Sequence, residues 1–258
     1  MSYTLITGAS KGIGQALAVE LAQKKKNLIL VARSETELEQ LATRLQETYS
    51  IKAIPLAVDL SSPEGSQTIY NYIERHGLAV DTLINNAGYA VWGNFESNDL
   101  SEQNKMLQLN MQTVVNLTHL LLPVLKREQQ AYILNIGSTS AYQALPTLAL
   151  YAASKSFIVA FSRALNFEFR HSNVSVTCVS PGPVNTNFVN RAGMQAIAET
   201  AEKFGMNADV LAKKALRAMY KKRVEYVPGF SNQLGVFFAY YLPKRWVEFA
   251  ASTLYTKK

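Results

Sequence analysis

The chain has 258 residues, of which 48% are hydrophobic and 17% charged, a composition that supplies a full core and excludes a disordered protein. Its net charge of +7 is spread along the sequence rather than gathered in a basic stripe, so we expect no nucleic-acid partner. A single cysteine, Cys178, excludes an internal disulfide framework and suits a reducing compartment.

Metal sites and membrane segments are not expected either. The three histidines show no metal-ligand spacing, so we predict no metal site. The sequence enters a strand pattern at once, and it has no run of about 18 uncharged apolar residues. We therefore expect neither a signal peptide nor a spanning helix, and we expect a cytoplasmic protein.

The first 26 residues read as a strand, a glycine-rich turn and a helix. The strand covers residues 3–7, the turn carries Gly8, Gly12 and Gly14, and the helix pattern follows over residues 15–26. This order brings backbone N–H groups and a helix N-terminus up to a phosphate group. The glycines permit a tight turn and a close approach of the backbone to a ligand. A tight loop without a ligand is the alternative.

A second strand over residues 27–33 precedes a helix over residues 34–48, with Ser34 as the expected N-cap of a capping box. In dinucleotide-binding folds the end of this strand faces the adenosine ribose. An acidic residue there selects NAD, whereas an arginine accommodates the 2′-phosphate of NADP. Here the strand ends in Arg33, and Lys11 in the first turn adds a second cation, so we predict a preference for NADP(H) over NAD(H). An ordinary exposed strand end is the alternative for Arg33.

The middle of the chain repeats the alternation of strand and helix. A third strand over residues 51–58 ends at Asp59, and residues 61–64 are predicted to begin a helix with proline in its first turn. A fourth strand over residues 80–84 leads into Asn85-Asn86-Ala87-Gly88. One long helix is expected over residues 98–126, with Asn110 in its apolar middle, where an amide is costly unless it is hydrogen-bonded.

The strongest chemical signal follows the strand at residues 131–137. Ser138 directly follows that strand, and Tyr151 and Lys155 stand four residues apart at the start of a predicted helix, on one face. An ammonium close to a phenol favours the phenolate and lowers the tyrosine pKa, which suits general acid–base catalysis. On its own, such a pair is more often an aromatic ring packed under a lysine stem.

A sixth strand over residues 174–179 breaks at residues 180–186, and the last strand candidate covers residues 223–227. Strands that alternate with helices of ten or more residues predict a parallel, doubly wound α/β sheet. We expect about seven strands with helices on both faces. Neither a repeat nor a linker divides the sequence, so one domain over residues 1–258 is predicted.

Taken together, these motifs resemble those of the short-chain dehydrogenase/reductase family, in its compact single-domain form. The resemblance covers residues 3 to about 190, and it rests on motifs that come in the family's order: Thr7 to Gly14, Asp59, Asn85 to Gly88, Asn110, Ser138, Tyr151 to Lys155 and Pro181 to Thr186. The resemblance implies a Rossmann-like fold and an NAD(P)-dependent oxidoreductase. The glycine spacing is that of the oxidoreductases rather than of the longer, extended members.

The resemblance also implies a role for each matching position. Tyr151 would exchange a proton with the substrate oxygen, and Lys155 would bond the nicotinamide ribose and lower the Tyr151 pKa. Ser138 would hold the substrate oxygen, and Asn110 would place a water in the proton relay. The positions that it assigns to cofactor binding are Gly8, Ser10, Lys11, Gly12, Ile13, Gly14, Arg33, Asp59, Leu60, Asn86, Ala87, Gly88, Tyr151, Lys155, Pro181, Gly182, Val184 and Thr186.

The expected function is therefore an NADPH-dependent carbonyl reductase, or in reverse an alcohol dehydrogenase, that acts on a ketone, an aldehyde or a secondary alcohol. A non-catalytic sensor or interaction protein with the same dinucleotide-binding fold is the alternative. By the same resemblance we expect a small-molecule carbonyl or alcohol substrate, and a homodimer or homotetramer paired through the helices that carry Asn110 and Tyr151. An apolar substrate is expected if the aromatic tail caps the substrate pocket.

The C-terminal part matches the family least. Residues 187–204 are expected to form a lid over the substrate, and residues 229–258 form a divergent, aromatic-rich extension. This extension puts an acyl-carrier substrate in doubt. It is predicted first as a helix pair packed on the body or on a neighbouring subunit. The alternatives are a cap over the substrate pocket and, less favoured, a segment resting on a membrane surface.

Overall fold

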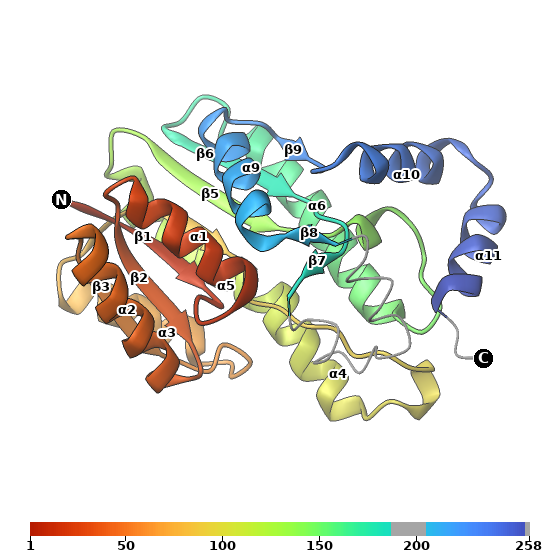
Figure 1. Ribbon diagram of the computed structural model, residues 1–258, viewed down its shortest axis with the longest axis horizontal. Coiled ribbons are helices and arrows are strands. Elements are labelled where there is room, and N and C mark those ends of the chain that lie inside the picture. The colour runs from red at the N-terminus through yellow and green to blue at the C-terminus, as the bar shows by residue number, and fades with distance from the viewer. Residues whose placement is uncertain (187–204, 256–258) are drawn as a thin grey trace.

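The computed structural model of the chain describes residues 1–186 and 205–255 (Figure 1). Its centre is a seven-stranded parallel sheet in the order β3-β2-β1-β4-β5-β6-β9. The strands are β1 (Ser2–Thr7), β2 (Asn27–Ala32), β3 (Ala53–Ala57), β4 (Ala79–Asn85), β5 (Ala131–Ile136), β6 (Val174–Val179) and β9 (Glu225–Tyr226). The predicted fold class, a doubly wound α/β sheet of about seven strands, is confirmed.

Helices cover both faces of the sheet. Three helices pack on one face: α1 (Gly12–Gln23), α2 (Glu35–Tyr49) and α9 (Ala208–Tyr220). Three others pack on the opposite face: α3 (Gly65–Arg75), α5 (Thr113–Lys126) and α6 (Ala149–Glu168). The sheet is thus the middle of three layers, as continuous apolar strands require in order to be buried on both faces.

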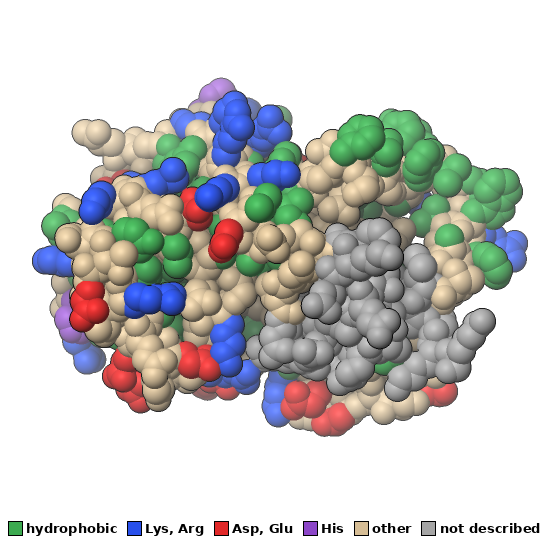
Figure 2. All heavy atoms as spheres, in the orientation of Figure 1, with side chains coloured by type: hydrophobic (Ala, Val, Ile, Leu, Met, Phe, Trp, Pro, Cys, Tyr) green, Lys and Arg blue, Asp and Glu red, His purple; other side chains and the backbone are tan. Residues whose placement is uncertain are grey.

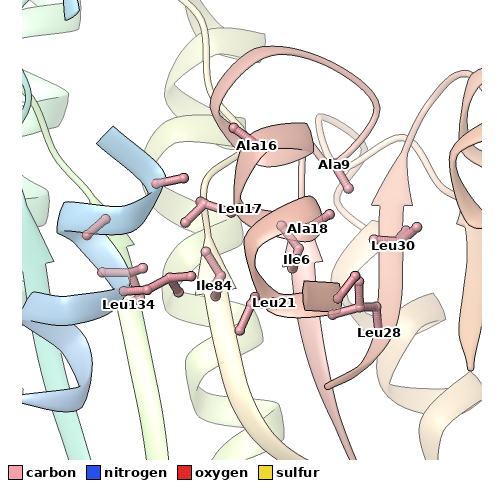
Figure 3. Close-up of a cluster of buried hydrophobic side chains, with 14 of the residues drawn as sticks. Ile6, Ala9, Ala16, Leu17, Ala18, Leu21, Leu28, Leu30, Ile84 and Leu134 are labelled. Atoms are coloured by element: carbon pink, nitrogen blue, oxygen red, sulfur yellow. The ribbon is translucent and has the colours of Figure 1, made fainter. Parts of the chain in front are cut away.

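Successive side chains of a strand point to opposite faces of the sheet, so each strand contributes to both cores. Leu5 packs against the α3 and α5 face, whereas its neighbour Ile6 packs against the α1 face. In Figure 3, Leu17 and Leu21 of α1 lie over Ile6 and the neighbouring strands. All four side chains are fully buried, and each such burial contributes about 1.5–3 kcal/mol of hydrophobic stabilisation.

The order of the strands creates a place for a ligand. β1 pairs with β2 on one side and with β4 on the other, so the chain winds outward in one direction up to β3 and then in the other direction from β4. The connections that leave the carboxyl ends of β1 and β4 therefore diverge to opposite faces. Open α/β sheets bind ligands at such a switch point.

The predicted long helix over residues 98–126 is wrong in its details. The structure has a short 3₁₀ turn (Phe95–Ser97), then α4 (Leu100–Leu107), a π-helical turn (Gln108–Gln112) and α5. Thr113 holds the widened turn, because its Oγ1 donates to the backbone oxygens of Leu60 and Gln108. The apolar spacing alone cannot reveal a turn that is held from outside the helix.

Smaller differences concern helix and strand ends. The helix after the third strand begins at Gly65, so Pro63 precedes it and does not lie in its first turn. The last strand has two residues rather than the predicted five, and Val184–Asn185 (β7) pairs with Met206–Asn207 (β8) in an unpredicted second sheet. The predicted lid at residues 187–204 lies outside the described residues, and the single-domain prediction stays a prediction.

The C-terminal extension forms two helices, α10 (Phe230–Tyr241) and α11 (Lys244–Tyr255). Figure 1 shows them at the end of the molecule opposite β3. Within the described residues, no helix is both long and apolar enough to cross a bilayer.

Candidate active site

The turn between β1 and α1 requires glycine at three positions. Gly8 and Gly12 have φ values of +66° and +56°, in the left-handed region that L side chains rarely adopt. Gly14 has ordinary dihedrals but no room, since a Cβ built on it would lie 2.1 Å from the Gly8 carbonyl oxygen. The glycine pattern in the sequence is therefore a geometric requirement of this turn.

The N-terminus of α1 is left open to an anion. Its N-cap, Lys11, makes no side-chain hydrogen bond to the first turn, and that turn contains no acidic residue. The first N–H groups of a helix have no partner within the helix and carry a partial positive charge. A dinucleotide pyrophosphate fits this position, so the residues present suit the cofactor that the sequence motifs imply.

The loop after β4 is bound to the loop after β1. The Asn86 Nδ2 donates to the backbone oxygens of Thr7 (2.9 Å) and Gly8 (3.2 Å), while the Thr7 Oγ1 accepts from the backbone N–H groups of Asn86 and Ala87. Asn86 thus positions the glycine turn with its side chain. Thr7 takes an equal part, although its position in the sequence predicts no role for it at the site.

At the predicted adenosine end, each cation has an acidic neighbour. The Lys11 Nζ lies 2.6 Å from Glu37 Oε1, and this contact is the main reason why the Glu37 pKa lies below its ordinary value. The expected capping box at Ser34 is not formed, because the Ser34 side chain caps no backbone N–H. Glu37 therefore joins the glycine turn, through Lys11 and Ser10, to Ser34 at the start of its own helix, a role that sequence reasoning missed.

Arg33 and Asp59 lie at the same end. Arg33 is exposed at the end of β2, and its charge acts on the Asp59 carboxylate. Burial raises the pKa of Asp59, but hydrogen bonds from Ser61 and the charge of Arg33 outweigh this effect and hold the pKa below its ordinary value. The structure brings the predicted adenosine contacts Lys11, Arg33 and Asp59 to the same edge of the sheet.

Some predicted cofactor positions can offer only their backbone. The Leu60 side chain is buried in the core on the α3 and α5 face, and its backbone oxygen accepts from Thr113 Oγ1 at 2.7 Å. Ile13 and Ala87 pack partly into the two cores as well. The Ser10 side chain is a hydrogen-bond partner of Glu37.

Lys155 is the buried cation of the site. Its Nζ donates to the Ile136 backbone oxygen at 2.9 Å and lies 5.8 Å from the centre of the Tyr151 ring. The side chains of both residues are buried, and burial lowers the pKa of Lys155 to about 8. Ile136 ends β5 two residues before Ser138, so α6 is fixed against the strand that delivers the serine.

Ser138 is joined by a second hydroxyl. Its Oγ accepts from the backbone N–H of Ser140 at 3.1 Å and from the Ser140 Oγ at 2.7 Å. Both contacts use Ser138 as an acceptor, which leaves its own proton for another oxygen. Ser140 was not predicted from the sequence, although its place in the short turn Thr139–Tyr142 puts it next to Ser138.

The π-helical turn delivers Asn110 to the site. Its Nδ2 donates to the Tyr89 backbone oxygen and to Ser154 Oγ, and its Oδ1 accepts from the Tyr89 N–H. A Cβ built on Gly88 would lie 2.9 Å from Asn110 Oδ1 and 3.6 Å from Lys155 Nζ. The structure thus brings Gly88, Asn110 and Lys155 together, and π-helical turns occur often at functional sites.

The segment Pro181 to Thr186 spans the two halves of the site. The Thr139 N–H donates to the Pro181 oxygen at 2.9 Å, next to Ser138. At the other end of the segment, the Thr186 side chain lies 3.2 Å from the position of a Cβ on Gly12. The predicted nicotinamide positions therefore connect the serine to the glycine turn, with Val184 between them in β7.

Gly182 in this segment touches the C-terminal extension. A Cβ on Gly182 would lie 2.4 Å from Asn232 Oδ1, and the Asn232 Nδ2 donates to the Pro228 oxygen at 2.8 Å. Asn232 belongs to α10, so the extension supports the cofactor side of the site. The sequence could not have revealed Asn232, because no motif connects it to this segment.

Apolar side chains surround the tyrosine. Tyr151 belongs to a buried cluster with Ala90, Met106, Leu145, Leu148, Ala152 and Ala251. A cavity of about 310 Å³ shares Met106 with this cluster, but Tyr151 does not line it, and its walls also carry the polar side chains Asn94, Glu96, Asn98 and Gln103. Its rim includes Thr147, whose φ of +65° is strained for a non-glycine residue and whose Oγ1 accepts from Trp92 Nε1.

A family model described as short chain dehydrogenase matches residues 2–197, about three quarters of the chain. The chain belongs to the short-chain dehydrogenase family. The resemblance inferred from the motifs is confirmed. So is the expected enzyme class, at the level of the family: an NAD(P)-dependent oxidoreductase acting on CH–OH and C=O groups.

Curated relatives of this short-chain dehydrogenase include two with informative names. Human 17-beta-hydroxysteroid dehydrogenase type 3 is 31% identical over 206 residues, which are 78% of this chain and 65% of the relative. The very-long-chain 3-oxoacyl-CoA reductase of Anas platyrhynchos is 34% identical over 191 residues, which are 72% of this chain and 60% of the relative. The chain thus spans less than two thirds of the length of either.

Solved structures show the same fold along nearly the whole chain. A short-chain dehydrogenase from Sphingobium yanoikuyae in complex with NADPH has a TM-score of 0.83 and 27% identity, and the match covers 98% of this chain and 93% of that one. A 7beta-hydroxysteroid dehydrogenase has a TM-score of 0.88 at 20% identity, covering 97% and 96%, and supports the fold alone. A nicotinamide dinucleotide is the cofactor that the family implies.

Proposed function

We propose that the protein reduces ketones on large apolar molecules with NADPH and catalyses the reverse alcohol oxidation. The observation that carries this proposal is the meeting of Asn110 and Lys155 at Gly88, beside an apolar cluster that contains Tyr151. The meeting point lies at the carboxyl ends of β4 and β5, close to the switch point of the sheet.

Tyr151 has the role of proton donor in this proposal. In reduction its phenol donates a proton to the carbonyl oxygen, and in oxidation its phenolate takes the proton of the alcohol. The bound nicotinamide supplies or accepts the hydride. The Lys155 ammonium, 5.8 Å from the ring centre, favours the phenolate over the phenol.

Ser138 orients the substrate oxygen. Because Ser140 donates to the Ser138 Oγ, the Ser138 proton points to a different acceptor, and a carbonyl oxygen is a suitable one. Asn110 acts as a positioning residue, since its amide holds the loop at Tyr89 and its Oδ1 keeps one lone pair for a water.

NADPH is the proposed cofactor. Arg33 directly follows β2, where an acidic residue would select NAD, and Lys11 adds a second charge near the 2′-phosphate position. The relative from Sphingobium yanoikuyae is described in complex with NADPH, which supports the same choice. Arg33→Asp is therefore expected to reduce or invert the ratio of NADPH to NADH affinity.

Two observations support a large apolar substrate. Aliphatic side chains form the wall around Tyr151. The two curated relatives act, by their names, on a hydroxysteroid and on very-long-chain 3-oxoacyl-CoA. Both substrates carry a ketone or secondary alcohol on a large apolar body.

A homodimer or homotetramer in the cytoplasm is proposed as the working form, because members of the family commonly associate. Helix α6 presents small exposed side chains, Ala153, Ala160 and Ala164, along one side, which would let a second helix approach closely.

The test is a titration with NADPH and NADH, followed by turnover read at the nicotinamide absorbance. A 17-ketosteroid, a long-chain 3-oxoacyl-CoA, a bulky diaryl ketone and acetone form the substrate panel. We expect tighter binding of NADPH and turnover of the large ketones. Tyr151→Phe should lower kcat by about 10²–10⁴-fold and retain NADPH binding.

Tyr220→Phe is the matched control. It removes a hydroxyl from a half-buried tyrosine on α9 that packs edge-on against Tyr132, and it should leave kcat unchanged. Equal affinity for the two cofactors would contradict the NADPH assignment. Binding of NADPH without turnover of any ketone would favour the non-catalytic sensor instead.

A further inference from the structure

The C-terminal helices carry most of the exposed apolar side chains. Nine of the fifteen large hydrophobic residues that the described part of the chain exposes lie between residues 230 and 249. Figure 2 shows them gathered along the outer edge of the molecule over α10 and α11. We call this surface the aromatic ridge; it consists of Phe230, Leu234, Phe237, Phe238, Tyr240, Tyr241, Leu242, Trp246 and Phe249.

Helix α10 turns its apolar stripe outward. Phe230, Leu234, Phe237 and Tyr241 follow one another at intervals of three or four residues, so they share one face of the helix, and they are 41–75% exposed. Ala239 is the buried residue of this helix. A helix of a globular protein ordinarily turns such a stripe toward the core, so the arrangement indicates an external apolar partner.

Helix α11 is fixed to the body by small side chains. Val247 packs with Tyr142 and Ile158, and Ala251 packs in the cluster that contains Tyr151. Trp246 directly precedes Val247, and Phe249 lies between Val247 and Ala251, but these two rings are 69% and 72% exposed. One face of the helix therefore packs against the body of the protein, while Trp246 and Phe249 are exposed to solvent.

Basic side chains accompany the rings. Lys244 and Arg245 are exposed immediately before Trp246, and the Lys244 Nζ donates to the Ala239 oxygen at the end of α10. From residue 228 to residue 258 the sequence contains four Lys or Arg residues and one acidic residue, Glu248. Rings of Trp and Tyr beside Lys and Arg are the combination that suits the boundary between lipid headgroups and acyl chains.

We propose that the aromatic ridge docks the protein on an anionic lipid surface. Phe237, Trp246 and Phe249 enter the headgroup region, and Arg245 binds lipid phosphates. A second copy of the chain is the less suitable occupant, because lysine is depleted in the cores of protein interfaces and Lys244 is exposed between Leu242 and Trp246 of the ridge.

Docking would bring the active site to the membrane. Ala251 on the inner face of α11 contacts the cluster around Tyr151, whereas Phe249, two residues earlier, lies on the outer face. The thickness of one helix therefore separates the lipid surface from the apolar wall of the site. This inference does not depend on the proposed substrate, because the ridge is defined by exposure and charge alone.

Flotation of the purified full chain with two kinds of vesicle tests the proposal. One kind is phosphatidylcholine alone, and the other is phosphatidylcholine mixed with phosphatidylglycerol. We expect the protein to float with the mixed vesicles, less with phosphatidylcholine, and less at high salt. The double variant Trp246→Ser/Phe249→Ser should reduce the bound fraction by roughly tenfold or more.

Phe167→Ser is the matched control. It removes an equally exposed ring, 66% accessible, which lies beside Arg170 on α6 and outside the ridge, and it should float like the parent. NADPH binding checks that each variant is folded. Arg245→Glu provides a second variant, which should lose the preference for the anionic vesicles while keeping all the rings.

Three results would overturn the proposal. The first is a parent chain that does not float with the mixed vesicles, and the second is a double variant that floats as well as the parent. The third is a double variant whose oligomer dissociates in light scattering while neither protein binds vesicles, because the ridge would then be an interface between copies.

Discussion

At the scale of single residues, Lys155 combines burial with charge. Its Nζ keeps one hydrogen bond, to the Ile136 oxygen, and burial lowers its pKa from 10.5 to about 8. Below pH 8 both the folded and the unfolded chain hold the proton, so the cost of burying the ammonium is fully present. Between pH 8 and pH 10.5 the folded chain loses the proton first, and the free energy of unfolding rises with pH.

Lys155→Met removes this titration. From pH 7 to pH 10 the unfolding free energy of the parent should rise by about 2–3 kcal/mol relative to that of the variant. The unpaired Ile136 oxygen costs the variant the same at every pH, so it does not affect the trend. Urea unfolding of both proteins without cofactor measures it. A difference that stays constant with pH would show that Lys155 titrates normally.

Glu37 is a second residue whose role depends on charge. Its contact with Lys11 at 2.6 Å neutralises part of the positive charge that favours a 2′-phosphate. Glu37→Gln frees Lys11 and should raise the ratio of NADPH to NADH affinity by about 2–5-fold, the usual range for an exposed ion pair. Glu35→Gln removes the same charge from an exposed site in the same turn and should leave the ratio unchanged. Direct titration of both cofactors measures these ratios.

At the scale of elements, the sequence predicts those features that are determined by residues close together in the chain. The glycine turn, the strands of the sheet and the pair Tyr151–Lys155 were recognisable because each depends on residues close together in sequence. The π-helical turn at Asn110 was not, since Thr113 holds it through the backbone of Leu60, 53 residues away. The Glu37–Lys11 pair could not be predicted for the same reason, because Lys11 lies in the glycine turn before α1 and Glu37 lies in α2.

Replacing glycine by alanine is expected to lower the stability of the protein in the glycine turn and to raise it in α10. A Cβ on Gly14 would meet the Gly8 oxygen at 2.1 Å and the Asn86 Nδ2 at 2.6 Å. Gly14→Ala should therefore displace the turn, cost about 1–3 kcal/mol of stability and weaken NADPH binding. A Cβ on Gly235 meets nothing within 4 Å, so Gly235→Ala should stabilise the chain by about 0.5–1 kcal/mol.

Urea midpoints and NADPH titrations of the two alanine variants provide the comparison. Gly235→Ala should bind NADPH like the parent, because it lies on α10 away from the glycine turn. If Gly14→Ala bound NADPH with unchanged affinity, the turn would not be the pyrophosphate site.

At the scale of the whole molecule, the parallel, doubly wound sheet followed from the alternation of strands and helices, but the placement of the extension did not. Nothing in the spacing of Phe230 to Tyr255 shows that Val247 and Ala251 would face the body while Trp246 and Phe249 would face outward. Both sets are apolar, so hydrophobicity alone cannot assign a side. The contact of Asn232 with Gly182 is likewise visible only in three dimensions.

The two main hydrophobic cores pack on opposite faces of the same sheet, so we expect them to unfold together. The core on the α1 face joins side chains from Ile6 to Met219, and the core on the other face joins Tyr3 to Val176. Neither core can be lost without exposing the shared strands, so we expect a single cooperative transition. The proposed cofactor site also spans both halves, since it runs from the glycine turn after β1 to residues 181–186 after β6.

Binding of NADP⁺ should therefore stabilise the whole chain rather than one part. At a concentration of 100 times Kd, binding adds about 2.7 kcal/mol to the unfolding free energy. For a chain of this size the melting temperature should rise by about 5–10 °C. Differential scanning calorimetry should show one peak whose calorimetric and van't Hoff enthalpies agree, with and without NADP⁺. Two peaks, of which NADP⁺ moves only one, would mean that the chain unfolds in two parts, because a ligand that bridges a single cooperative unit must shift all of it.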